Sequence, residues 1–132
     1  TARLVYAQMN YTDEFAVDIY GSAALVNEKG VTAQIAFGMD NNYKCELEVW
    51  GSKGCLATGR VLTAPVGFVP IVTIRKGNDE ETRKLSADDA FGKSIRHFLA
   101  CVTDDETRKS NYKALIKQAE LVDQFRRLAG EE

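Results

Sequence analysis

Apolar and polar side chains alternate along residues 31–60, and this alternation is the most regular pattern in the chain. A period of two residues predicts half-buried strands, because successive side chains of a strand point to opposite faces of its sheet. Three strands are predicted, over residues 31–37, 43–50 and 55–57. The turns between them contain glycine and asparagine, which tolerate turn dihedral angles. The stretch therefore predicts a β-meander.

Further strands are expected on both sides of this meander, over residues 4–9, 15–26, 71–76 and 80–85. Within the second of these, Gly21 and Ser22 predict a bulge or bend. The last strand is short and charged, as expected at a sheet edge. Residues 61–70 contain both prolines of the chain, which predicts an irregular segment.

The hydrophobic period changes at Ser86, where two helices are expected to begin. Ser86 and Asp89 have the spacing of an approximate capping box, and Ser110 is the expected cap of a second helix that ends before Gly130. The first helix carries apolar residues at helical spacing: Phe91, Ile95, Phe98 and Val102.

This order of elements predicts an α+β fold in a single domain, residues 1–132. We expect an open, mostly antiparallel sheet of about six strands, with the two C-terminal helices packed on one face. The other face is then uncovered and bears large residues, which is typical of an interface. We therefore expect a homo-oligomer formed through the open sheet face.

Composition places the chain among globular proteins, with 132 residues, 45% hydrophobic and 27% charged. A net charge of −2 argues against a nucleic-acid partner, and no apolar run is long enough to cross a membrane. Cys45, Cys55 and Cys101 lack metal-site spacing, so we expect reduced thiols and a cytoplasmic location. The chain begins without methionine, which favours an excised domain or a processed fragment.

Catalytic and metal-binding motifs are weak. His97 is the only histidine and has no neighbouring ligand motif, so a helix-packing role is favoured over a metal or general-base role. Ser52 lies in a turn between two strands, which does not fit a hydrolase nucleophile. The Gly51–Gly54 turn resembles an RNA-binding GXXG loop, but that loop joins helices. No phosphate-binding glycine loop is present.

Tyr43, Glu48, Trp50 and Arg60 lie near the turns of the meander, where functional residues are common. The residue types alone favour ordinary cross-strand packing over a functional site.

The ordered pattern Tyr43-x-x-x-x-Glu48-Val49-x-Gly51-x-x-Gly54 resembles the C-terminal domain of the glucose–fructose oxidoreductase / inositol dehydrogenase family (Gfo/Idh/MocA). The Gly21–Gly30 region, a phenylalanine-bearing helix and the final helix with ALIKQAELVDQF are similar too. Members of this family are NAD(P)-dependent enzymes of sugars, polyols or nucleotide-linked sugars. In the whole enzyme, the resemblance implies NAD or NADP as cofactor and a small-molecule sugar substrate.

The resemblance also implies site residues. Tyr43 looks like a tyrosine that faces substrate, Asn41 and Asn42 are candidate ligands for sugar hydroxyls, and Arg60 is a candidate contact for phosphate or sugar. The family's cofactor loop, catalytic lysine and catalytic histidine motif do not occur in this sequence. We therefore expect no catalytic residue, no metal site and no cofactor bound by this chain alone. The alternative is a stand-alone open-sheet module for protein interaction.

Overall fold

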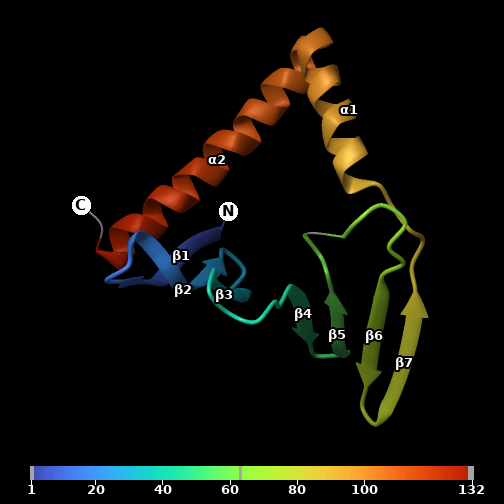
Figure 1. Cartoon of the computed structure of the whole chain (residues 1–132). Coiled ribbons are helices and arrows are strands. Elements are labelled where there is room, and N and C mark those ends of the chain that lie inside the picture. Colours follow the sequence, from blue (N-terminus) through green and yellow to red (C-terminus); the bar gives the residue numbers. More distant parts are fainter. Residues whose placement is uncertain (1, 63, 131–132) are drawn as a thin grey trace. The chain divides into compact units, whose positions relative to one another are not determined.

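The computed structural model describes residues 2–62 and 64–130, and the chain divides into two compact units. Thr1–Asn41 and Asp105–Glu132 form the first, and Asn42–Asp104 the second. The strands are β1 (Ala2–Thr12), β2 (Phe15–Asn27), β3 (Thr32–Gly38), β4 (Glu46–Gly51), β5 (Gly54–Gly59), β6 (Ile71–Lys76) and β7 (Asp79–Lys84) (Figure 1). The helices are α1 (Ala90–Thr103) and α2 (Asp105–Ala129).

The first unit is a three-stranded antiparallel sheet, in the order β1-β2-β3, with α2 packed against β1. Its core is formed by Leu4, Ala7 and Ala23, against which Leu121 and Phe125 of α2 pack. Burying an apolar side chain fully is worth about 1.5–3 kcal/mol, so this small cluster is the main hydrophobic contribution to the unit.

The opposite face of the same sheet is polar. The Tyr6 hydroxyl donates a hydrogen bond to Gln8 Oε1 at 2.6 Å, and Gln8 Nε2 donates to Asn10 Oδ1 at 3.3 Å. The strand register places Tyr20 and Ser22 of β2 beside this row. Among the described residues of the first unit, no helix covers this face.

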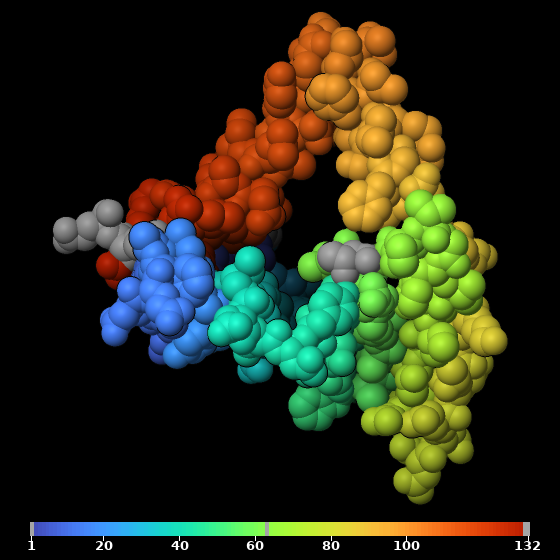
Figure 2. Space-filling view, in the orientation of Figure 1, coloured from blue at the N-terminus to red at the C-terminus, as the bar shows by residue number. Residues whose placement is uncertain are grey.

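The second unit contains a four-stranded antiparallel sheet, in the order β4-β5-β6-β7. Register and alternation place Leu47 and Val49 on the same face as the buried Val72. Glu48 and Trp50 share the other face, and Trp50 is 90% exposed. The charged strand β7 forms one edge of this sheet, and the β6–β7 hairpin ends in a protruding tip (Figure 2).

The α+β class is confirmed, but the single sheet of about six strands is wrong. Seven strands form two separate sheets of three and four strands. The break follows β3, because residues 43–45 do not join a ladder as predicted and β4 begins only at Glu46. The expectation for the helices is also corrected: α2 packs on β1, whereas α1 has no comparable packing on the described strands of its own unit.

Three local predictions change as well. Gly21 pairs in register with Met9 and Phe37, so the predicted bulge is absent there; the irregularities of the β1–β2 ladder lie between Leu4 and Tyr6 and between Asn10 and Thr12. Asp89, not Ser86, caps α1, because its carboxylate accepts the Gly92 N–H at 2.8 Å. Ser110 lies inside α2, which begins at Asp105 with acidic residues in its first turn.

Candidate functional site

Arg60 follows the last residue of β5 and has an unusual backbone conformation. Its φ angle is 51°, and among the described residues it is the one non-glycine residue with a positive φ. Its N–H donates a hydrogen bond to the Cys45 carbonyl at 2.6 Å, which holds it beside the start of β4. A left-handed conformation costs a non-glycine residue about 1–3 kcal/mol, and such residues cluster at functional sites.

The Arg60 guanidinium lies against two aromatic rings. Its Cζ is 5.1 Å from the centroid of the Tyr43 ring and 5.8 Å from that of the Phe68 ring. Both distances are in the range of cation–π attraction. The three side chains come from the segment before β4, the end of β5 and the segment before β6. We call Tyr43, Arg60 and Phe68 the Arg60 cluster.

The electrostatic setting of Arg60 differs from that of two other arginines in the same unit. Arg75 is paired with Glu80 at 2.6 Å and Arg83 with Glu81 at 2.5 Å, and these hydrogen bonds raise the pKa of both guanidinium groups. Within residues 2–62 and 64–130, no carboxylate lies within ion-pair distance of Arg60. Its planar set of N–H donors is therefore available to an anion, which guanidinium groups bind in a bidentate manner.

The cluster is accessible from solvent. Tyr43 is 59% exposed, Arg60 is exposed and Phe68 is half-buried. Phe68 lies in a turn in which its N–H donates to the Pro65 carbonyl at 3.1 Å, and Gly67 has a φ of 80°. Only glycine adopts that angle readily, so this residue allows the turn that presents the Phe68 ring.

The predicted site residues are divided between the two units. Tyr43 and Arg60 are in contact with each other. Asn41 belongs to the first unit, where its side chain lies so close to Gly38 that an added Cβ would be 2.3 Å from Asn41 Oδ1. Asn42 opens the second unit and is exposed. Contact of these residues with a sugar stays a prediction.

Phe68 was not predicted from the sequence. The segment of residues 61–70 was expected to be irregular because of its two prolines, and it does contain no helix or strand among its described residues. The two prolines of this segment could have indicated an ordered loop. Their fixed φ angles stiffen the segment and favour a defined position for the residues between them.

Other candidate sites are weaker. His97 and Cys101 lie one helical turn apart on α1, with Nε2 and Sγ separated by 3.7 Å. The three cysteines are free of disulfides, as expected. Within the described part of the chain, no group of three or more histidine, cysteine, aspartate or glutamate side chains is arranged to hold a metal. None of the described helices is both long and apolar enough to span a membrane.

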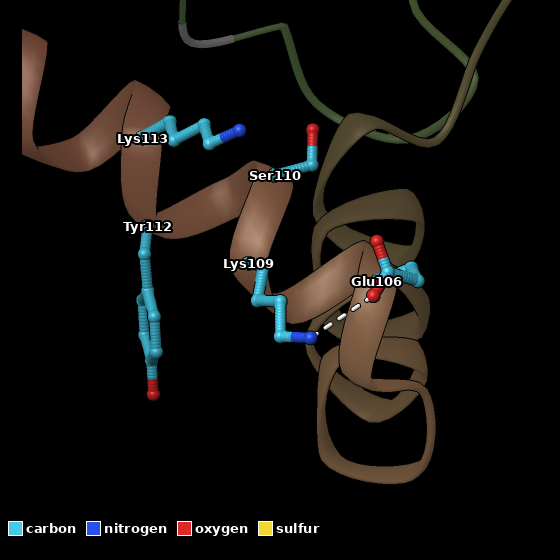
Figure 3. A pocket seen from close by; sticks show the side chains of 5 residues that line it. All are labelled: Glu106, Lys109, Ser110, Tyr112 and Lys113. Carbon is cyan, nitrogen blue, oxygen red and sulfur yellow. Dashed lines mark hydrogen bonds and ion pairs between the residues drawn. The ribbon is translucent and has the colours of Figure 1, made fainter.

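A shallow depression on the first turns of α2 also lacks the features of a site. Glu106, Lys109, Ser110, Tyr112 and Lys113 line it (Figure 3). Glu106 and Lys109 form an ion pair at 3.0 Å, while the Tyr112 ring and the Lys113 side chain point in different directions. A binding site requires polar groups that converge, so this surface is ordinary solvated helix.

Comparison with known proteins relates the chain to one class, the reductases of nucleotide-linked keto sugars. No protein-family profile matches the chain. It is 37% identical over 122 residues to dTDP-3,4-didehydro-2,6-dideoxy-alpha-D-glucose 3-reductase of Actinomadura kijaniata, covering 92% of this chain and 37% of the relative. It is 35% identical over 122 residues to the enzyme of the same name from Streptomyces violaceoruber, covering 86% of this chain and 36% of the relative.

Among the solved structures that resemble it are those of KijD10, a 3-ketoreductase from Actinomadura kijaniata. The complex with NADP matches with a TM-score of 0.88 and 36% identity, over 95% of this chain and 40% of that one. The open conformation with TDP-benzene and NADP matches with a TM-score of 0.82 and 35% identity, over the same shares of the two chains. The fold is therefore that of a part of this reductase. The chain spans little more than a third of the length of these relatives.

Proposed function

We propose that this chain is the substrate-side, C-terminal domain of an NADP-dependent reductase of a nucleotide-linked keto sugar, in the Gfo/Idh/MocA family. The similarity to dTDP-sugar 3-reductases supports the substrate class, and the NADP complexes of KijD10 support the cofactor. Hydride transfer needs a nicotinamide placed against the reacting carbon. We assign cofactor binding and proton transfer to polypeptide outside these 132 residues, since the sequence has no dinucleotide loop.

The Arg60 cluster is the observation that carries this proposal. An arginine with unpaired donors, a fixed backbone and two aromatic contacts is suited to a diphosphate. In this function Arg60 binds the diphosphate of the nucleotide sugar, and the Tyr43 hydroxyl contacts the substrate. Asn41 and Asn42 supply hydrogen bonds to sugar hydroxyls. The three cysteines form no disulfide, which is consistent with the reducing cytoplasm as the compartment.

The test is the dTDP affinity of the protein that carries this chain, measured by isothermal titration calorimetry for the wild type and for Arg60→Ala. A charge-assisted hydrogen bond contributes about 1.5–3 kcal/mol, so we expect dTDP to bind roughly 10- to 150-fold more weakly to the variant. Arg83→Ala is the matched control, because it removes an exposed guanidinium that is already paired with Glu81. Tyr43→Phe should raise KM or lower kcat for the sugar nucleotide.

Equal dTDP affinity in wild type and Arg60→Ala would contradict the site. Equal losses in Arg60→Ala and Arg83→Ala would contradict it too, because a general change in surface charge would then explain both.

We also propose that the polar face of the first sheet, formed by Tyr6, Gln8, Asn10, Tyr20 and Ser22, mediates a homo-oligomer. Two exposed tyrosines beside amide and hydroxyl groups have the composition of an interface with a polar rim.

A further inference from the structure

The Phe68 ring contributes to the Arg60 cluster without being placed to bind substrate itself. Its centroid lies 5.8 Å from the Arg60 Cζ, and the ring is half-buried where Tyr43 is exposed. A phenyl ring has no hydrogen-bond donor for a diphosphate. Any effect of Phe68 on anion binding must therefore act through the guanidinium.

We propose that Phe68 is a positioning residue, which holds the Arg60 guanidinium in the orientation that binds the diphosphate. The inference rests on the proposed function, because it needs Arg60 to bind an anion. The physical reason is conformational entropy: an exposed arginine has many rotamers, and a side chain held in one of them loses less freedom when it binds. The Tyr43 and Phe68 rings together restrict those rotamers.

The segment that carries Phe68 is anchored at its end and turned in its middle. The Pro70 carbonyl accepts the Leu85 N–H at 2.9 Å, which ties the end of the segment to the residue after β7. Two residues earlier, the Phe68 N–H closes the turn onto Pro65 at 3.1 Å. A ring held by such a segment is a fixed surface for the guanidinium, whereas a ring on a loose loop would move with it.

The backbone of Arg60 acts in the same direction. Its φ of 51° and the hydrogen bond from its N–H to Cys45 fix where the side chain leaves the main chain. The backbone thus fixes the direction in which the Arg60 side chain leaves the main chain, and the two rings restrict the position of its guanidinium. Removing one ring leaves the charge in place but frees its orientation, so the loss should be smaller than that on removing Arg60.

The experiment is a double-mutant cycle in the protein that carries this chain, with dTDP as the probe in calorimetric titrations. We expect Phe68→Leu to weaken dTDP binding about two- to fivefold, the factor that an exposed cation–π contact is worth. Phe68→Tyr keeps the ring and should restore wild-type affinity. In an Arg60→Gln background, Phe68→Leu should cause no further loss, because there is no guanidinium left to position.

The matched control is Phe91→Leu, the same chemical change at an exposed phenylalanine of α1. It should leave dTDP affinity unchanged. Phe68→Met, whose unbranched and flexible side chain fills irregular gaps better, replaces the leucine variant if that protein melts at a lower temperature than wild type. If Phe68 had only a structural role, Phe68→Leu would lower the melting temperature. Its effect on dTDP affinity would then be the same with and without the Arg60 guanidinium.

The outcomes separate the inference from the function on which it rests. If Arg60→Gln weakens binding but Phe68→Leu does not, or if the two losses are additive, the positioning role is wrong and the binding role of Arg60 stands. If dTDP binds wild type and Arg60→Gln equally, or binds neither, the proposed function fails and the positioning role fails with it.

Discussion

Gly21 is a position at which a single added methyl group should strongly disturb the first unit. It lies in the central strand β2, between Met9 of β1 and Phe37 of β3. A Cβ built there would lie 2.4 Å from the backbone carbonyl oxygen of Gln8 and 2.7 Å from Cζ of the Phe37 ring. Both distances are well inside van der Waals contact, and one of the two atoms belongs to the backbone of a paired strand. Gly21→Ala therefore cannot be accommodated by a rotamer change alone.

The magnitude follows from what must move. Overpacking a core by one methyl group typically costs about 1–3 kcal/mol. The Phe37 ring would also have to leave its tilted contact with Phe125, now at a centroid distance of 5.9 Å, and such aromatic pairs are worth about 0.5–1.5 kcal/mol. Alanine restricts the unfolded chain more than glycine does, which offsets about 0.4–1 kcal/mol. Together these contributions predict that Gly21→Ala lowers the free energy of unfolding by about 0.5–4 kcal/mol.

The assay is urea denaturation followed by circular dichroism, in the protein that carries this chain. Gly51→Ala is the matched control, because a Cβ at Gly51 would meet only the Gly54 carbonyl oxygen, at an ordinary 3.8 Å. The control should change the free energy of unfolding by less than about 1 kcal/mol. A Gly21→Ala protein as stable as the Gly51→Ala protein would refute the argument, because the close approach of β1 and Phe37 would then carry no energetic cost.

Two further predictions concern the helix cap and the oligomer. Asp89→Ala should destabilise α1 by about 0.5–2 kcal/mol in thermal denaturation, whereas Ser86→Ala should have no effect. A larger destabilisation by Ser86→Ala than by Asp89→Ala would instead support Ser86 as the cap, as expected from the sequence. Light scattering over a range of concentrations should give a dimer or a larger assembly that Tyr20→Lys dissociates, because the substitution adds charge to the polar sheet face. A monomer at high concentration would contradict the proposed interface.

The sequence pattern predicted the second sheet well because a period of two is a local property. Leu47 and Val49 do share a face opposite Glu48 and Trp50, and Cys55 lies opposite Trp50 across the Gly51–Gly54 turn as expected. Alternation reports which side chains share a face, but it carries no information on where a ladder of hydrogen bonds stops. The alternation continues through residues 43–45, so it predicted a strand there and a single sheet where the structure has two.

Helix starts failed for a related reason. Ser86 and Asp89 are both good caps, and both precede the same run of apolar residues. Which of them caps the helix depends on whether the intervening residues take helical dihedral angles. Those angles depend on the tertiary structure and cannot be read from the local sequence. Similarly, Ser110 looked like a cap, but Asp105 and Glu106 favour an earlier start through the helix dipole.

The candidate site shows the same limit more sharply. Tyr43 and Arg60 were identified through a family resemblance, and the structure brings them into contact across the β4–β5 pair. Phe68 is eight residues beyond Arg60 in an irregular segment, where no periodicity relates a side chain to its neighbours. Its contact with Arg60 could only be found from the geometry of the loop.

The exposed surface explains why the site is better understood as one half of an active centre than as a complete one. A compact monomer of 14.6 kDa exposes about 6,900 Å², and two separate compact bodies of half that mass about 8,300 Å² in total. This chain exposes 10870 Å², with large apolar side chains such as Leu115 and Ile116 more than half exposed. Surface of this kind is buried against further polypeptide or another copy. In the proposed function, Arg60 presents the diphosphate to a nicotinamide held by further polypeptide, so that this chain recognises the substrate and the further polypeptide carries out hydride transfer.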